Sequence, residues 1–256
     1  SVISTETFWG KPVTVDLEDS ISAPMYYFGI LKWQESNLIK FLIKNLQEDD
    51  VFYDIGASYG FYSVLAAEII TEGKIHAFEP SDRMFNILGS QFEESSNVTL
   101  NKSAVSDTTG KINFFDGSKF GDTEFSTTVE QTAEMQKLQG RTLQRKQIES
   151  TTLDEYTSSG HTPPSFIKID VEGAEPKVIK GGQKTIKENK PVISMEVRED
   201  NDETNLYENA INLLLNLNYT LCTINKNGQA KRKNPDKWKE LVRNDFDNFL
   251  FIHHEK

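Results

Sequence analysis

Carboxylates stand where several short apolar runs of this chain come to an end. Asp54 follows the run VFY and leads into the turn DIGASYG, and Glu79 ends the run KIHAFE. Three further acids close two later runs: Asp170, Glu172 and Glu196. In open α/β sheets, ligands bind beyond the carboxyl ends of the strands. We therefore expect these acids to face a ligand or a reacting group.

The turn at residues 54–60 has the spacing Asp-x-Gly-x-x-x-Gly, which differs from two familiar phosphate sites. A dinucleotide turn needs G-x-G-x-x-G and a Walker loop needs G-K-[ST], and this turn has neither. Gly56 and Gly60 let the backbone come close to a ligand, while Asp54 favours positive charge or donor groups. Glu79, about 20 residues later, is well placed to accept both hydroxyls of a ribose. S-adenosylmethionine, a nucleoside with a cationic tail, fits both features.

Methyl transfer from a sulfonium needs an aligned acceptor and, for a hydroxyl, removal of its proton. We expect Asp170 to act as base or to orient the acceptor, with Glu196 opposite it and Glu172 beside them. Three such oxygen donors could instead hold Mg²⁺ or Ca²⁺, so metal dependence stays open. Lys168 shares a strand face with Asp170, and it and Arg198 could simply neutralise the acids.

The four histidines are not expected to act as the base. His76 lies inside its predicted strand, and His161 precedes the strand that ends at Asp170. His253 and His254 end a strand that we expect to run antiparallel, which places them away from the ligand.

The acids are positioned by β-rich runs that alternate with helical patterns, an arrangement that predicts an α/β fold. Apolar residues recur at spacings of three and four between 206 and 217, as on one face of a helix. The alternation predicts right-handed crossovers and a mostly parallel sheet with helices on both faces. The predicted strands are 51–55, 74–79, 98–105, 166–171, 191–197, 219–224 and 248–253, and the predicted helices are 31–46, 60–70, 82–94 and 204–218.

We expect one domain over residues 1–256. Residues 1–49 would form an N-terminal helical or cap segment, and residues 50–256 the core. The polar stretch 117–150 is too long for an ordinary connection and predicts a lid, a binding loop or a partly disordered insertion. Two further runs are predicted as extra strands on either side of it: 111–116 and 151–156.

Composition narrows the possible partners. The chain has 256 residues, 28 basic and 39 acidic, with a net charge of -11. Such acidity gives no general reason to bind nucleic acid or an anionic membrane. We find no run of about 18 apolar residues and expect a cytoplasmic protein; its oligomeric state is not predicted. Cys222 is the single cysteine, so we expect a core thiol and no internal disulfide.

One strongly basic stretch, residues 226–240, should leave the sheet at the ligand end. It is either a solvated loop with a short helix, or it brings Lys231, Arg232 and Lys233 to an anionic acceptor such as a phosphorylated or uronate-bearing glycan.

Residues 51–197 resemble the FkbM-type family of S-adenosylmethionine-dependent methyltransferases. The resemblance lies in VFYDIGASYGFYSVLAA, IHAFEPSDRMFNIL, VTLNKSAVSDTTGKINFF, TTLDEY and FIKIDVEGAEPKVIKGG, of which IDVEGAE is the most distinctive. It implies a class I methyltransferase fold, with a seven-stranded, Rossmann-like sheet whose last strand is antiparallel. It also implies methyl transfer to an oxygen, often a hydroxyl of a sugar, a glycan or a glycosylated metabolite.

The resemblance further implies how the cofactor is bound. The glycine turn would line the methionine end, Glu79 would take the ribose, residues 103–105 would lie beside the adenine, and Glu35 would contact the methionine moiety. Family members often carry asparagine where this chain has Ser58 and Tyr59. The cofactor-binding candidates are Glu35, Asp54, Gly56, Ala57, Ser58, Gly60, Glu79, Pro80, Ser103, Ala104, Val105 and Asp170.

Other functions remain open. The chain could be a domain that binds the cofactor without transferring a methyl group, or a methyltransferase for a non-sugar small molecule, including an amine or carboxyl acceptor. A nicotinamide oxidoreductase is disfavoured, because the turn lacks G-x-G-x-x-G.

Overall fold

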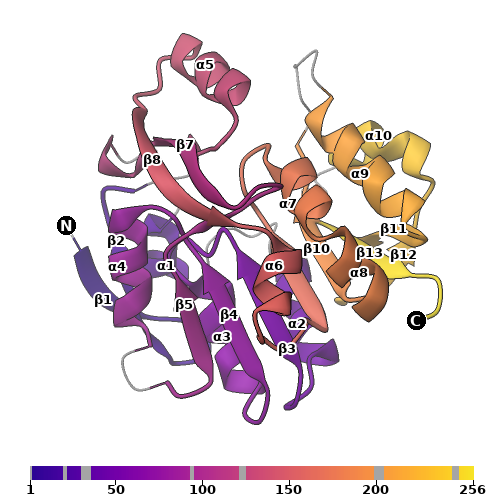
Figure 1. Cartoon of the computed structure of the whole chain (residues 1–256). Coiled ribbons are helices and arrows are strands. Elements are labelled where there is room, and N and C mark those ends of the chain that lie inside the picture. Colours follow the sequence, from indigo (N-terminus) through magenta and orange to yellow (C-terminus); the bar gives the residue numbers. More distant parts are fainter. Residues whose placement is uncertain are drawn as a thin grey trace.

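The structure is a computed structural model that describes residues 2–19, 22–29, 36–92, 95–120, 125–198, 205–243 and 248–256. Within these residues, the centre of the molecule is a sheet of eight strands in the order β12-β11-β13-β10-β9-β3-β4-β5 (Figure 1). The strands are β3 (Val51–Ile55), β4 (Lys74–Phe78), β5 (Val98–Asn101), β9 (Phe166–Ile169), β10 (Val192–Glu196), β11 (Tyr219–Ile224), β12 (Ala230–Arg232) and β13 (Asn248–His253).

The directions of these strands confirm the predicted class I methyltransferase fold. Strands β5, β4, β3, β9 and β10 pair in parallel. Strand β13 lies between β10 and β11 and is antiparallel to both. The seven predicted strands are all present, and β12 adds an eighth at the edge because the chain turns back on β11.

Helices cover both faces of the sheet, and the alternation of side chains along each strand supplies both cores. Phe52 and Phe166 pack on one face with α2 and α3, whereas Tyr53 and Ile167 pack on the other with α7 and α9. The helices on the first face are α2 (Ser36–Asn45), α3 (Phe61–Ile69) and α4 (Asp82–Ser90); those on the second are α6 (Leu153–Ser158), α7 (Glu175–Gly181), α8 (Gln183–Asn189), α9 (Leu206–Asn216) and α10 (Trp238–Val242).

The N-terminal segment, predicted as a helical or cap segment over residues 1–49, contains strands as well as the helices α1 (Ala23–Phe28) and α2. It begins with an antiparallel hairpin of β1 (Val2–Glu6) and β2 (Pro12–Asp16), followed by the short helix α1. Val13 and Val15 are buried at alternate positions of β2, which is the period of a strand rather than of a helix.

The predicted strand 98–105 is divided between two sheets. Strand β5 belongs to the central sheet, and β6 (Ala104–Val105) belongs to a small sheet of order β6-β8-β7. Its other strands, β7 (Gly110–Asp116) and β8 (Gln144–Thr151), flank the insertion. The described part of the insertion holds a 3₁₀ turn, η2 (Ser118–Phe120), and α5 (Glu130–Leu138), and α5 projects beyond the central sheet (Figure 1).

The predicted extra strand at 151–156 is wrong. Thr152 is the N-cap of α6, where its side chain accepts a hydrogen bond from the Glu155 backbone N–H. Asp154 and Glu155 in the first turn add a favourable interaction with the helix dipole. The segment TTLDEY therefore begins a helix, despite its β-like composition.

The basic stretch 226–240 leaves β11 at the carboxyl edge of the sheet, as expected, because β11 runs parallel to β10. It does not bring Lys231, Arg232 and Lys233 to the cleft, whose lining contains none of them. Its first part turns back as β12, with Arg232 paired to Cys222, and the rest forms η4 (Pro235–Lys237) and α10. The turn lies against α2, where Lys40 and Lys44 donate to the carbonyls of Lys226 and Asn227. Cys222 is buried. A search of the described residues finds no helix with the length and hydropathy to cross a membrane.

Candidate functional site

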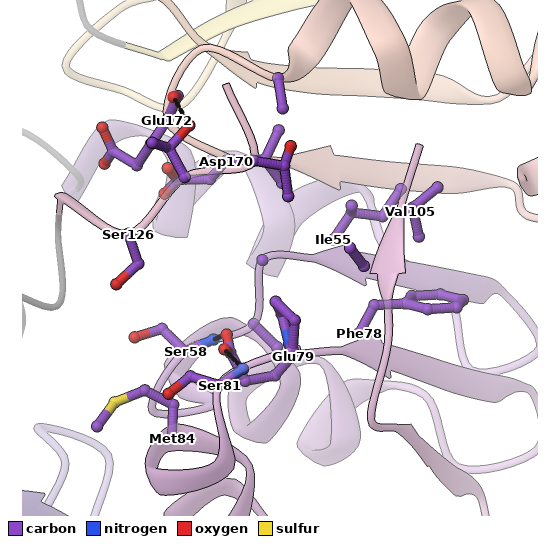
Figure 2. A pocket seen from close by; sticks show the side chains of 18 of the residues that line it. Ile55, Ser58, Phe78, Glu79, Ser81, Met84, Val105, Ser126, Asp170 and Glu172 are labelled. Atoms are coloured by element: carbon purple, nitrogen blue, oxygen red, sulfur yellow. Dashed lines mark hydrogen bonds between the residues drawn. The ribbon is translucent and has the colours of Figure 1, made fainter. Parts of the chain in front are cut away.

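A cleft of about 1100 Å³, its open mouth included, lies at the carboxyl ends of β3, β4, β9 and β10. Figure 2 shows Asp170 and Glu172 on one side of it and Ser58, Glu79, Ser81 and Met84 on the other. Of the predicted site residues, those that line the cleft are Gly56, Ala57, Ser58, Glu79, Pro80, Ser103, Ala104, Val105, Asp170, Glu172 and Glu196. Glu35 lies outside the described residues.

Backbone hydrogen bonds hold the glycine turn after β3 to the end of β4. The N–H groups of Gly56 and Ala57 both donate to the Phe78 carbonyl at 3.0 Å. Gly56 has a φ of +80°, and a Cβ there would lie 1.9 Å from the Asp170 carbonyl oxygen. Only glycine therefore permits the turn to pass so close to the end of β9. Gly60 packs against Leu88 of α4 and does not line the cleft.

Asp54 does not lie in the cleft, contrary to the expectation from its place before the turn. Its side chain is 1% exposed. One oxygen accepts a hydrogen bond from the Ser63 hydroxyl at 2.6 Å, and the other lies 3.9 Å from the Lys168 ammonium. Burial raises the pKa of Asp54, an effect that Lys168 and Ser63 partly oppose. Asp54 thus sits beneath the turn, tied to α3 and β9.

Glu79 presents a carboxylate whose two oxygens are both anchored by backbone groups. The Ser58 N–H donates to Oε2 at 2.9 Å, and the Ser81 N–H donates to Oε1 at 2.8 Å (Figure 2). Each carboxylate oxygen retains a further acceptor position, so a pair of neighbouring hydroxyls could also donate to it. Burial raises the pKa of Glu79 to about 7, although the two N–H groups oppose the shift.

Across the cleft, three acids form a compact cluster. Asp170, Glu172 and Glu196 each bring a carboxylate oxygen within 4.8 Å of the others. Lys168 is paired with Asp170 at 3.1 Å, which confirms the pairing predicted from strand alternation. Arg198 contacts Glu172 at 2.8 Å and Glu196 at 3.1 Å. The cluster is therefore neutralised in part by two bases.

The acids of this cluster differ in their ionisation. Burial alone would raise the pKa of Asp170, but the nearby Lys168 and Arg198 hold it below its ordinary value. Glu172 is more strongly affected by burial, and its pKa is raised well above the ordinary value despite Arg198. Asp170 is thus ionised at neutral pH.

The sequence did not single out several parts of the cleft lining. Phe78, Met84 and Phe114 give it an apolar side next to Val105. The insertion contributes three hydroxyls, from residues 126–128. No local pattern marks these positions, because their place in the cleft depends on tertiary contacts.

One such contact holds the insertion at the acid cluster. The Thr127 hydroxyl donates to the Glu172 carbonyl at 2.8 Å, and Thr127 also pairs with Phe115 of β7. Glu172 has a φ of +54°, so this hydrogen bond supports a backbone conformation that a side chain rarely adopts.

The four histidines lie away from the cleft lining. His76 is buried within β4, and its Nδ1 is 2.8 Å from the Tyr156 hydroxyl. His161 stacks on the ring of Tyr156. His253, at the end of β13, packs edge-on against Tyr219. This arrangement agrees with the expectation that none of them acts on the ligand.

The family model for the methyltransferase FkbM domain matches residues 54–221. The hexuronic acid methyltransferase AglP of Haloferax volcanii is 26% identical over 149 residues, covering 57% of this chain and 56% of that protein. The solved structure of methyltransferase FkbM from Methylobacillus flagellatus is 16% identical, with a TM-score of 0.51, and the match covers 82% of this chain and 44% of that one. This chain thus spans about half the length of these two proteins.

The matched residues 54–221 make up well over half of the chain and contain both the glycine turn and the acid cluster. The chain belongs to the FkbM methyltransferase family.

Proposed function

We propose that the protein transfers a methyl group from S-adenosylmethionine to a hydroxyl of a sugar or glycan. The observation that carries the proposal is one cleft in which Glu79, beside the glycine turn, faces the ionised Asp170 across the ends of β3, β4 and β9. Family membership supports the reaction class. A sugar acceptor is supported by the relative whose name describes a hexuronic acid methyltransferase.

The residues present fit the cofactor. Glu79 has acceptor positions for the two ribose hydroxyls, and Phe78, Val105 and Met84 offer apolar surface for a flat base. The turn at Gly56 allows the backbone to approach the amino-acid end. When bound, S-adenosylmethionine supplies an electrophilic methyl group on a sulfonium, and the ionised Asp170 in the cleft favours that positive charge.

Asp170 is the residue we assign to the acceptor. Its lowered pKa keeps it ionised, so it accepts a hydrogen bond from the acceptor hydroxyl and receives the proton that the hydroxyl loses. A base with a low pKa removes protons weakly. Much of the rate should therefore come from alignment, which can supply about 7–11 kcal/mol of the barrier.

The charge of the cleft favours a hydroxyl over a carboxylate as the methylated group. Among the described lining residues there are four acids, Glu79, Asp170, Glu172 and Glu196, against two bases, Lys168 and Arg198. A carboxylate held at the reacting position would meet the ionised Asp170. If the acceptor is a uronic acid, we therefore expect one of its hydroxyls to react. The alternative role of residues 231–233 in holding an anionic acceptor has no support from their position on and after β12.

A divalent cation at the acid cluster was the open alternative. Carboxylate oxygens are suitable ligands for Mg²⁺ or Ca²⁺, but both bases already contact these oxygens. The residues present therefore do not fit a resident cation, and we propose transfer without one.

The test has a binding and a transfer arm. Calorimetry with S-adenosylmethionine, S-adenosylhomocysteine and NAD⁺ should show binding of the first two only. Labelled methyl transfer to neutral sugars and to uronic-acid disaccharides then identifies the acceptor. Asp170→Asn should lower kcat by about 100-fold or more while affecting cofactor affinity much less.

The outcomes separate the alternatives. Cofactor binding without transfer to any hydroxyl would favour a binding domain or a different acceptor class. Absence of S-adenosylmethionine binding would refute the proposal as a whole.

A further inference from the structure

Two basic side chains occupy the space among the acids of the cleft that a cation would otherwise take. The three carboxylates have oxygens within 4.8 Å of one another, a spacing that three oxygen ligands around one divalent ion would also have. Asp170 and Glu172 lie at the ends of the same short segment after β9, and Glu196 ends the neighbouring strand β10. The backbone therefore fixes the cluster, whatever cation neutralises it.

Arg198 contacts every carboxylate oxygen of the two glutamates. Its Nη1 and Nη2 donate to Oε2 and Oε1 of Glu172 at 2.8 and 2.9 Å. Nη2 also donates to Oε1 of Glu196 at 3.2 Å, and Nε lies 3.1 Å from Oε2. The planar, forked guanidinium suits two carboxylates at once. A metal ion would have to displace it to reach either glutamate.

Lys168 is the second base at the acid cluster, and it lies between Asp170 and the buried Asp54. Its ammonium lies 3.1 Å from Oδ2 of Asp170, 3.9 Å from Oδ1 of Asp54 and 4.9 Å from the centre of the Tyr62 ring. Its side chain is 5% exposed, so it cannot swing out to solvent without moving its neighbours. Together the two bases supply two positive charges, the charge of one divalent ion.

We propose that Arg198 and Lys168 act as a built-in counter-cation that replaces a metal ion. Arg198 is a positioning residue: it fixes Glu172 and Glu196 around Asp170, which faces the acceptor. Removing its guanidinium converts the cluster into a divalent-cation site, because three acids are then balanced by Lys168 alone. The activity readout rests on the proposed function, whereas cation binding can be measured without it.

The main experiment titrates the protein with Mn²⁺, followed by electron paramagnetic resonance, and with Ca²⁺ by calorimetry, in the absence of cofactor and acceptor. Wild type should bind neither ion at this cluster at micromolar to millimolar concentrations. Arg198→Ala should bind one ion per chain. The double variant Arg198→Ala with Glu196→Gln should lose that binding, because it lacks one of the three carboxylates.

Two controls keep the result interpretable. Arg198→Lys retains a positive charge without the fork and should not bind Mn²⁺. If Arg198→Ala fails to fold, Arg198→Lys takes its place as the folded variant at this position. The comparison of Mn²⁺ binding by wild type and by Glu196→Gln then still tests the first half of the proposal, that the wild-type cluster holds no metal ion. In wild type, EDTA should leave methyl transfer unchanged.

Wild-type binding of one Mn²⁺ that Glu196→Gln abolishes would overturn the proposal, since the cluster would then be a metal site. Failure of a folded Arg198→Ala variant to bind any divalent ion would overturn the claim that the guanidinium stands in for one. If wild type binds no ion and transfers no methyl group, the proposed function fails and this inference survives.

Discussion

At the scale of single residues, Glu79 is a buried acid of the cleft whose ionisation changes near neutral pH. It is 6% exposed and accepts hydrogen bonds from two backbone N–H groups. Burial raises its pKa to about 7, and Asp116 nearby acts in the same direction. Lys146 opposes the rise of its pKa only weakly. The ionised form accepts hydroxyl donors more strongly than the neutral acid. Near neutral pH, cofactor affinity should therefore depend on the charge of this one side chain.

We expect the affinity for S-adenosylmethionine to fall as the pH is lowered from 8 to 6, because protonation removes the charged acceptor. Well below the pKa the loss approaches about tenfold per pH unit. Glu79→Gln should bind about tenfold more weakly at pH 8 and should lose the pH dependence. Calorimetry at several pH values measures both effects.

Glu175 supplies the matched control. Burial raises its pKa to about 7 as well, but it is fully buried at the start of α7 and does not line the cleft. Glu175→Gln should keep the pH dependence of binding. An equal slope in Glu79→Gln and wild type would show that another group controls the affinity.

The position of Asp54 shows what a sequence reveals about an individual residue and what it does not. The run VFYDIG correctly marks a buried strand, and the turn that follows it lines the cleft. Alternation also places Asp54 on the same face as Phe52, which packs beneath α2 and α3, so its distance from the cleft could have been inferred. The hydrogen bond between Asp54 and Ser63 could not have been inferred, because it depends on how α3 packs against the sheet. For Asp170 and Lys168, which share a strand face, the alternation of side chains was sufficient to predict their ion pair.

At the scale of elements, the insertion connects the two sides of the cleft. At the base of the β7–β8 hairpin, Asp116 accepts a hydrogen bond from the Ser81 hydroxyl at 3.2 Å, and Lys146 lies 2.8 Å from it. Lys146 also reaches Asp82 at 3.1 Å, at the start of α4. Ser81 in turn donates its N–H to Glu79. The hairpin therefore supports the side of the cleft that would hold the ribose.

Asp116→Asn should weaken S-adenosylmethionine binding several-fold and destabilise the fold by about 1–3 kcal/mol, because the buried Ser81 and the partly exposed Lys146 lose a charged partner. Calorimetry and thermal unfolding measure the two effects. Lys111→Met is the matched control: it breaks the pair with Glu149 on the same hairpin, where both side chains are more than half exposed. Such a pair contributes about 0–1 kcal/mol.

The two variants together decide whether the hairpin supports the cofactor site. If Lys111→Met weakens binding as much as Asp116→Asn, the effect comes from the hairpin's general charge and not from its anchor at α4. If neither weakens it, the insertion serves the acceptor side alone.

Elements were easier to predict where their pattern is local. The buried strands 51–55 and 219–224 were placed to the residue, since continuous apolar runs bounded by turns define them. The insertion could not be placed, because nothing in residues 126–128 indicates that they reach the Glu172 segment. The run 98–105 was divided because two non-adjacent strands, β4 and β8, each pair with one part of it.

At the scale of the whole molecule, the buried acids and the net charge both lower the stability of the fold as the pH rises. The chain carries a net charge of -11. Burial raises the pKa of Glu79 and of Glu175 from 4.5 to about 7 in the folded state. Between these values both carboxyls bind more protons in the folded protein than in the unfolded chain, which lowers stability as pH rises. Self-repulsion of the acidic chain adds to the same trend. Burial lowers the pKa of His76 from 6.5 to about 4, and this single group opposes the trend below pH 6.5.

We therefore expect the protein without ligand to unfold at a lower temperature at pH 8 than at pH 5.5. Between pH 5.5 and 7 each of the two glutamates removes about 2 kcal/mol of stability, and His76 offsets about 1 kcal/mol of the total. The difference in Tm should therefore be on the order of 5–10 °C. Glu175→Gln should raise Tm at pH 8 and flatten the profile, because glutamine can still accept the Val171 N–H that Glu175 accepts at 3.1 Å.

Glu149→Gln separates the local contribution from the global one. It changes the net charge by the same unit, but its side chain is 62% exposed, so it should leave the pH profile almost unchanged. Added salt screens repulsion between exposed charges and affects a buried group much less. The flattening by Glu175→Gln should thus persist at high salt. If Glu149→Gln flattens the profile equally, or if salt abolishes the slope in wild type, net charge and not the buried acids controls the stability of this fold.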